Sequence, residues 1–319
     1  MLTIGTIEII IRGVFFFHPP TPPIVVVSEN QKLIYELNPS HPEINSQGMR
    51  QGSIGPLTEK FVIAVIGDSH TYSVKAKRWQ DSFPARLEDH LGTLHGRPVR
   101  VLNFGVPGYN MAQELEVLRT KVLPLHVDLV ILQYCINDEH ISNYIQPENM
   151  WLNRLIHKSV ALPRLWKGLL YSGLGKALLL PYIEVVAPDL LLFEPGLVGA
   201  PRWGDEDSAH APHPPRTKDR VPPRYHAVVG REKLERDVLT FGSSAQSARL
   251  PLLATGFIEE RDRLLYEKSG FQVYSFFEMF RGQDMRAFGY NPQYTADHFS
   301  ELENEFIGNA LADFMRVKF

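Results

Sequence analysis

The sequence has a single cysteine, Cys135, and a formal net charge of only −3. One cysteine excludes an intrachain disulfide framework and any metal site built from several thiolates. With 33 Lys+Arg against 36 Asp+Glu, the chain lacks the basic surplus of a nucleic-acid-binding protein, so we expect no nucleic-acid partner. Hydrophobic residues at 44% and charged residues at 22% are ordinary globular values, which exclude wholesale disorder.

The sequence also lacks a long apolar segment. Residues 4–17 are apolar, but Glu8 and Arg12 interrupt them and the run is too short to span a bilayer. No basic stretch precedes it and no small-residue cleavage site follows, so we expect a buried strand rather than a signal peptide. Membrane association would require an anchor upstream of this chain, and the compartment stays open between cytoplasm and cell envelope.

From residue 61 onward, strand and helix patterns alternate. Phe61 to Ile66 is a continuous apolar run, typical of a central parallel strand buried on both faces. Further strands are predicted at 98–102, 127–133, 250–254 and 271–276, and helices at 81–94, 111–122, 228–246, 257–268 and 301–315. In the last helix, Leu302, Phe306, Ala310 and Phe314 are expected on the buried face. The pattern predicts a three-layer α/β/α fold with a central parallel sheet of about five strands.

The chain divides into an N-terminal extension, 1–58, and an α/β domain, 59–319. Short extended pieces are expected in the extension at 24–27 and 33–37. A largely helical insertion is expected at about 141–225, ending in a Pro- and His-rich loop. His210 and His213 in that loop have no partners at zinc spacing, so we expect no metal site there.

The carboxyl ends of the predicted strands carry residues suited to acyl transfer. Ser69 follows the first strand, Gly108 the second and Asn137 the third, while His298 precedes the last helix. In open parallel sheets these strand ends meet at one edge, where ligands bind. A serine hydroxyl needs an adjacent base, usually histidine, and a tetrahedral intermediate needs N–H donors for its oxyanion.

The ordered set Gly67-Asp68-Ser69, Gly108, Asn137-Asp138 and His298 resembles the SGNH (GDSL-type) hydrolase superfamily of esterases and lipases, which has a flavodoxin-like fold. The resemblance implies that Ser69 is the nucleophile and His298 the general base. It also implies an oxyanion hole made by the backbone N–H groups of Ser69 and Gly108 and the side chain of Asn137. Stretches 44–50, 101–110 and 128–133 are similar to typical bacterial members, and the insertion is unmatched.

Two positions depart from the family pattern. Cys135 stands where the third block usually opens with glycine. Thr295 stands where an aspartate usually lies three residues before the histidine, and the only nearby acid is Asp297. We take Asp297 as the acid that orients His298. A Ser69–His298 dyad, oriented by Thr295 or by a backbone carbonyl, stays open as the alternative.

The sequence therefore predicts a serine ester hydrolase that acts through an acyl-enzyme on a small-molecule, carbohydrate or lipid ester, with no cofactor and no metal. An O-acyltransferase on the same scaffold, modifying a polysaccharide or lipid, is one alternative. A non-catalytic binding domain is the other. Asp68 is expected to cap a helix, Asp138 to be a structural loop acid, and Cys135 to be inert packing.

Overall fold

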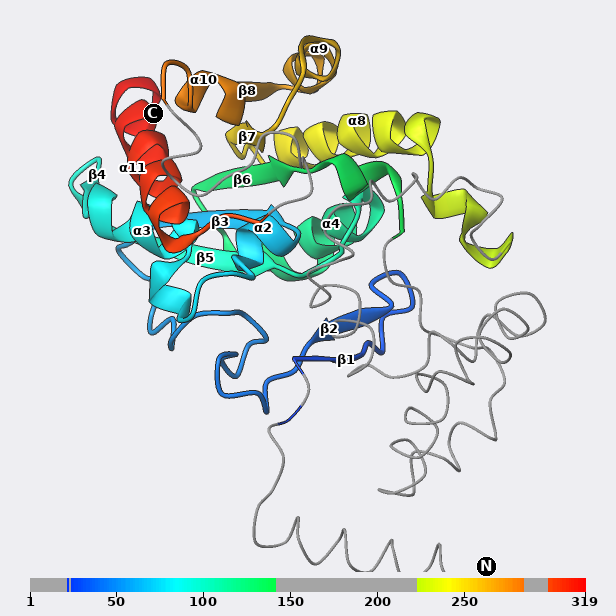
Figure 1. Cartoon of the computed structure of the whole chain (residues 1–319), viewed down its shortest axis with the longest axis horizontal. Helices are drawn as coiled ribbons and strands as arrows, with labels where there is room; N and C mark the ends of the chain where they lie inside the picture. The colour runs from blue at the N-terminus through cyan, green and yellow to red at the C-terminus, as the bar shows by residue number, and fades with distance from the viewer. Residues whose placement is uncertain (1–21, 23, 142–222, 284–297) are drawn as a thin grey trace, which may run out of the picture.

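The structure is a computed structural model that describes residues 22, 24–141, 223–283 and 298–319 (Figure 1). The apolar segment 4–17, nearly all of the insertion, and Thr295 and Asp297 lie outside the described residues.

A six-stranded sheet forms the centre of the molecule, in the order β4-β5-β3-β6-β7-β8. All neighbours pair in parallel except β4, which pairs antiparallel with β5 at one edge. The strands are β3 (Phe61–Gly67), β4 (Thr93–Leu94), β5 (Arg97–Gly105), β6 (Leu129–Tyr134), β7 (Leu252–Gly256) and β8 (Phe271–Ser275). The five predicted parallel strands are confirmed. The two-residue β4 is too short to leave a periodic pattern, and the sequence did not predict it.

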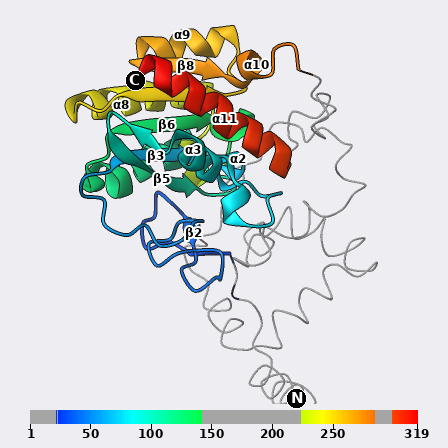
Figure 2. The ribbon, with the colours of Figure 1, turned by 90° about the vertical axis from the view of Figure 1, so that its left-hand side faces the viewer.

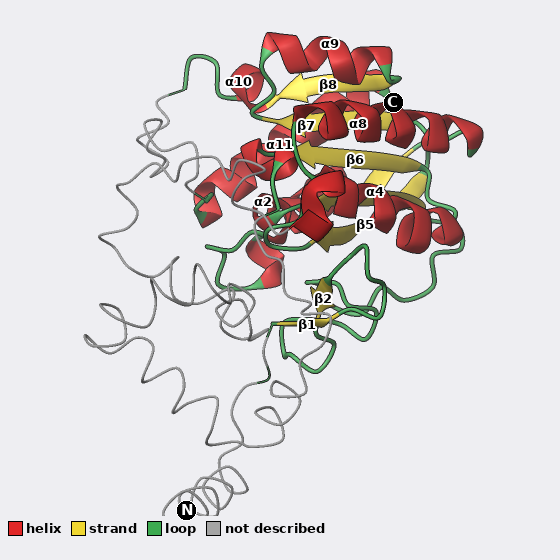
Figure 3. Ribbon diagram, turned by 90° about the vertical axis from the view of Figure 1, so that its right-hand side faces the viewer, coloured by secondary structure: helices red, strands yellow, loops and turns green. Residues whose placement is uncertain are grey.

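Alternate residues of the central strand face two separate cores, which is why the run from Phe61 to Ile66 is wholly apolar. Ile63 and Val65 pack on the side of α3 (Phe83–Leu91) and α11 (Glu301–Lys318). Ala64 and Ile66 pack on the other side, with α4 (Met111–Val117), α8 (Arg231–Ser247) and α9 (Glu260–Lys268). Figures 2 and 3 show these two helical layers, so the predicted α/β/α architecture is confirmed.

Shorter elements complete the described chain. These are α2 (Ser69–Tyr72), α10 (Phe276–Met279), a π-helical turn at Leu118–Val122 that continues α4, and 3₁₀ turns at Trp79–Asp81, Leu123–Leu125, Ile136–Glu139 (η4) and Pro223–Val228. Within the described residues, no helix combines the length and apolar character needed to cross a bilayer.

The buried face of α11 differs from the prediction. Leu302 is 60% exposed, whereas Ile307, Leu311, Ala312 and Met315 are fully buried. Phe306, Ala310 and Phe314 are only partly buried. The contact face includes Asn304 and Gly308, and a Cβ on Gly308 would lie 2.6 Å from the Cβ of Arg86 on α3. The contact face of α11 thus includes a polar residue and a glycine, which apolar spacing does not reveal. The predicted buried face was therefore wrong by one residue.

The N-terminal extension packs on the loop that follows β5. Its strands β1 (Val25–Val27) and β2 (Tyr35–Leu37) lie within the two predicted extended pieces, and they pair antiparallel with each other (Figure 1). The Tyr35 hydroxyl donates to the carbonyl of Pro107 at 2.8 Å, and Nε2 of Gln113 donates to the carbonyl of Leu33 at 2.7 Å. The extension therefore supports the segment that carries Gly108.

Candidate active site

Ser69 is the first residue of α2, immediately after the carboxyl end of β3. Asp68 caps this helix, because its Oδ1 accepts a hydrogen bond from the backbone N–H of His70 at 2.9 Å. The expected capping role of Asp68 is thus confirmed. The turn holds the Ser69 side chain at the sheet edge, where it is 7% exposed.

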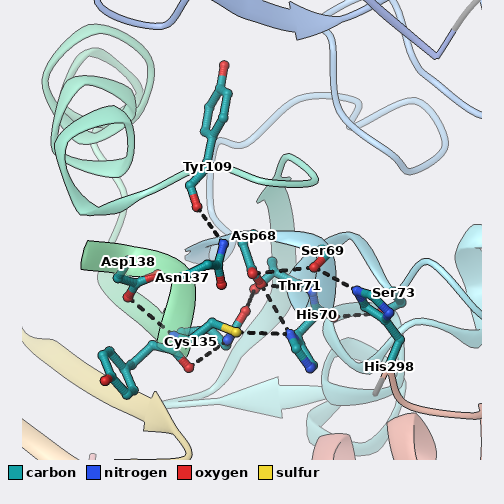
Figure 4. A network of polar contacts seen from close by, with 12 residues as sticks. Asp68, Ser69, His70, Thr71, Ser73, Tyr109, Cys135, Asn137, Asp138 and His298 are labelled. Carbon is teal, nitrogen blue, oxygen red and sulfur yellow. Dashed lines mark hydrogen bonds and ion pairs between the residues drawn. The ribbon is translucent and has the colours of Figure 1, made fainter. Parts of the chain in front are cut away.

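His298 lies against Ser69, although 229 residues separate them in the chain. The His298 Nε2 and the Ser69 Oγ are 2.8 Å apart (Figure 4). In the tautomer whose Nε2 is unprotonated, the imidazole accepts the hydroxyl proton, which is the arrangement of a hydroxyl and its base. Ser69 Oγ also lies 3.3 Å from Asp68 Oδ2.

Two buried side chains hold the C-terminal end of α2, Asn304 from α11 and Arg50 from the N-terminal extension. Asn304 Oδ1 accepts hydrogen bonds from the Ser73 hydroxyl at 2.8 Å and from the backbone N–H of Phe83 at 3.0 Å. Arg50 Nη1 donates to the carbonyls of Tyr72 and Ser73. Because α11 begins three residues after His298, the Asn304 bonds hold the segment that carries the imidazole next to the helix that carries the serine. Sequence reasoning did not assign either role.

Two of the predicted oxyanion donors have defined local geometry. Gly108 has φ +79°, in the left-handed region that glycine adopts without strain. Asn137, on η4, donates one amide N–H to the carbonyl of Tyr109 at 3.1 Å, and its second N–H points elsewhere. Figure 4 shows Asn137 beside the Asp68–Ser69 turn. Among the described residues, neither the backbone N–H of Ser69 nor that of Gly108 makes a hydrogen bond.

The site holds a buried negative charge. Burial by itself would raise the pKa of Asp68, but the hydrogen bonds and positive charge of His70, together with the charge of His298, lower it below its usual value. Asp68 is therefore a carboxylate next to the serine and near the imidazole. Burial and the nearby Asp68 charge raise the pKa of Cys135 well above its usual value, so Cys135 is a thiol and a poor nucleophile.

The structure brings together three side chains that sequence reasoning did not connect. Asp68, His70 and Cys135 offer ligand atoms that all lie within 4.8 Å of one another, and no other part of the described chain has such a group of three. The His70 ring also lies against the His298 ring, with their centroids 5.1 Å apart and their planes tilted by 30°. Strand pairing places them at one sheet edge, since Asp68 and His70 follow β3 and Cys135 follows its neighbour β6, but no sequence spacing shows that their side chains meet.

Behind Asn137 lie two further buried acids. Asp138 Oδ2 accepts from the backbone N–H of Cys135 at 3.2 Å, which agrees with its expected structural role. Glu114, on α4, is fully buried, and neither of its carboxylate oxygens has a hydrogen-bond partner among the described residues. Burial, followed by the charges of Asp138 and Asp68, raises the pKa of Glu114 well above its usual value.

Comparison with known proteins gives a likeness at the level of structure. A scan against protein-family models and a search of curated proteins each gave no match. Solved structures did match. The chain resembles solved G-D-S-L proteins. One of them, described as a lipolytic protein of the G-D-S-L family from Desulfitobacterium hafniense DCB-2, is 9% identical, with a TM-score of 0.38 over 80% of this chain and 99% of that chain.

Two carbohydrate esterases are also similar. A catalytic mutant of an acetylxylan esterase from Geobacillus stearothermophilus is 12% identical, with a TM-score of 0.41 over 81% of this chain and 94% of that chain. A two-domain esterase active on acetylated mannans is 8% identical, with a TM-score of 0.44 over 80% of this chain and 49% of that chain. Likeness at these values concerns the fold alone and carries no information about the reaction.

Proposed function

We propose that this protein is a serine ester hydrolase that works through an acyl-enzyme. The observation that carries the proposal is the 2.8 Å contact between Ser69 Oγ and His298 Nε2 at the carboxyl edge of a parallel sheet. A serine hydroxyl is a weak nucleophile until a base within hydrogen-bond reach can take its proton. The fold supplies such a base from the opposite end of the chain.

In the proposed reaction, Ser69 Oγ attacks the ester carbonyl while His298 Nε2 takes the hydroxyl proton. The backbone N–H groups of Ser69 and Gly108 and the side-chain amide of Asn137 then bind the oxyanion. As the intermediate collapses, His298 returns the proton to the departing alcohol and leaves an acyl group on Ser69. Water attacks that ester with His298 again as the base, which releases the acid and restores the enzyme.

The acid that orients His298 stays a prediction, because Asp297 and the alternative Thr295 both lie outside the described residues. Besides the predicted acid, the described part of the site contributes the carboxylate of Asp68. Asp68 is close enough for its charge and that of His298 to interact, so it favours the imidazolium that forms during the reaction. This electrostatic contribution does not depend on which residue orients the ring.

The proposed substrates are small-molecule, carbohydrate or lipid esters. An O-acyltransferase would form the same acyl-enzyme and pass the acyl group to a sugar hydroxyl instead of water. A non-catalytic binding domain would have no need for the Ser69–His298 contact, which argues for an enzyme. Product analysis with and without an added sugar acceptor separates hydrolysis from transfer.

The test is the identity of the acylated residue. With a nitrophenyl acetate substrate, Ser69→Ala should lose several orders of magnitude in kcat, toward the roughly million-fold loss that follows deletion of a serine nucleophile. The exposed Ser243→Ala on α8 serves as the matched control and should retain the parent rate. After treatment with a fluorophosphonate, mass spectrometry should place the adduct on Ser69. An adduct on another serine or on Cys135 would contradict the proposal.

A further inference from the structure

A compact group of three different donor atoms lies directly beneath Ser69. His70 Nδ1 is 3.3 Å from Asp68 Oδ1 and 3.5 Å from Cys135 Sγ (Figure 4). The three side chains are 1%, 3% and 5% exposed for Asp68, His70 and Cys135 respectively. A carboxylate, an imidazole and a sulfur are thus held together in the interior.

Hydrogen bonds join these side chains, because the His70 imidazole and the Cys135 thiol both bond to the Asp68 carboxylate, but the His70 nitrogen is shared between two partners. An imidazole nitrogen has one in-plane position, which holds either a proton or a lone pair. The single Nδ1 of His70 faces both an oxygen and a sulfur, so it can make a full hydrogen bond with only one of them. The 3.3 Å contact with the oxygen is also longer than the usual length of about 2.9–3.0 Å for an N–H···O bond.

Two of the three ligand separations match a tetrahedral metal site, and the third, between the Asp68 oxygen and the Cys135 sulfur, is at most 4.8 Å. With Zn–N and Zn–O distances of about 2.0–2.1 Å and a Zn–S distance of about 2.3 Å, neighbouring ligands lie about 3.4 Å apart for N and O and about 3.6 Å apart for N and S. The observed values are 3.3 Å and 3.5 Å. Imidazole, carboxylate and thiolate are all ligands that Zn²⁺ takes in proteins.

The backbone holds each ligand in place before any ion binds. Asp68 and His70 are fixed to each other by the cap of α2, since Asp68 Oδ1 accepts the backbone N–H of His70. Cys135 is fixed at the start of η4, where its sulfur accepts the backbone N–H of Asp138 and its own N–H donates to the Asp138 side chain. The ligands come from the ends of the paired strands β3 and β6.

We propose that Asp68 Oδ1, His70 Nδ1 and Cys135 Sγ bind one Zn²⁺ ion and that this ion switches off the reaction at Ser69. As the Zn–S bond forms, the thiol proton of Cys135 passes to solvent. No spacing in the sequence predicts this site, because its ligands come from two strand ends. It departs from our expectation that the chain has no metal site and that Cys135 is inert.

The inhibitory part rests on the proposed function. Asp68 would give its charge to the ion rather than to the Ser69–His298 pair, which it now contacts through Oδ2. The ion would also add positive charge close to the His298 ring, since the rings of His70 and His298 are 5.1 Å apart. Positive charge there opposes the protonation of His298 that nucleophilic attack requires. The near-complete burial of the three ligands favours this role over that of a metal that activates a substrate water.

Metal binding is tested on the full chain after chelator treatment. Titration with Zn²⁺ against a chromophoric chelator should give one tight equivalent, and Co²⁺ should give the near-ultraviolet charge-transfer absorption of a cobalt thiolate. Cys135→Ser and His70→Ala should abolish this absorption and weaken Zn²⁺ binding by about a hundred-fold or more, since even the loss of an outer partner costs about ten- to a hundred-fold. His90→Ala is the matched control, because His90 pairs with Asp313 at 3.2 Å on the surface without a sulfur ligand.

Circular dichroism of each variant establishes that it is folded. A parent chain without a stoichiometric Zn²⁺ site, or variants that bind Zn²⁺ as the parent does, would overturn the proposed site. One equivalent of Zn²⁺ should slow ester hydrolysis by the parent at least ten-fold, whereas Cys135→Ser should keep its own metal-free rate. Stoichiometric binding without inhibition would overturn the inhibitory role, and a chain that binds Zn²⁺ but hydrolyses no ester would count against the proposed function instead.

Discussion

At the scale of single residues, Asn137 shows how the site prepares its donors. One amide N–H is committed to the carbonyl of Tyr109 at 3.1 Å. This bond fixes the plane of the amide, so the other N–H has a set direction before a substrate arrives. A donor that needs no reorientation stabilises the oxyanion more than one that must be ordered during the reaction.

We predict that Asn137→Ala lowers kcat about a hundred- to a thousand-fold with little change in KM, because the lost hydrogen bond exists only in the transition state. Steady-state kinetics with a nitrophenyl ester measures both constants. Asn137→Asp keeps the size of the side chain but replaces the N–H donor by a carboxylate that repels the oxyanion, so it should lose at least as large a factor. A change confined to KM would instead make Asn137 a substrate-binding residue.

Sequence reasoning could place individual residues at the sheet edge but could not give the contacts among them. That Ser69, Gly108, Asn137 and His298 belong to one edge follows from parallel strands. That His70 meets Cys135 depends on the cap of α2 and the turn of η4, which involve side-chain directions that strand patterns do not encode. The acid partner of His298 stays a prediction for a related reason. Thr295 and Asp297 are only two positions apart, and strand patterns do not give the direction of either side chain.

At the scale of elements, the start of α11 determines where His298 lies. Asn304 is fully buried and accepts hydrogen bonds from both Ser73 and Phe83, which belong to the segments after α2 and at the start of α3. Apolar patterns predicted α3 and α11 along the chain, but not the four-residue α2. They did not predict how α11 is rotated, because Asn304 and Gly308 carry no apolar signal.

We predict that Asn304→Ala destabilises the fold by about 1–3 kcal/mol, since it leaves the buried N–H of Phe83 without an acceptor and the Ser73 hydroxyl with only the His70 carbonyl. It should also lower kcat, because the constraint that holds His298 against Ser69 is weakened. Urea denaturation and ester kinetics measure the two effects. Glu305→Ala, at the neighbouring exposed position, is the matched control and should change neither. A parent-like kcat in Asn304→Ala would show that His298 is positioned by other contacts.

At the scale of the whole molecule, the buried acids make stability depend on pH. Burial and the charge of Asp138 raise the pKa of Glu114, and burial and the charge of Asp68 raise that of Asp138. In the unfolded chain these carboxyls ionise near their usual values of about 3.9–4.3. Above that range the folded state binds more protons than the unfolded state, so the free energy of unfolding falls as pH rises toward the folded pKa values.

We predict that Glu114→Gln reduces the fall of the free energy of unfolding with rising pH. The free energy of unfolding of the variant relative to the parent should increase with pH by up to about 1.4 kcal/mol per pH unit within that window. Urea denaturation between roughly pH 4.5 and 8 measures it, and the slope is independent of any fixed packing cost. Glu305→Gln, exposed on α11, should follow the parent. If the free energy of unfolding varies with pH in the same way for Glu114→Gln and the parent, Glu114 is ionised in the folded protein.

The pairing of β6 with β7 joins two parts of the chain that each hold half of the site. Ser69, Gly108 and Asn137 lie before residue 141, and His298 lies after residue 223. A peptide bond cut between those positions would leave the hydroxyl and its base on separate fragments, held together only by the sheet and its two cores. Turnover by such a nicked protein would then follow the concentration of the fragments, so the fold is a natural starting point for a split-enzyme reporter.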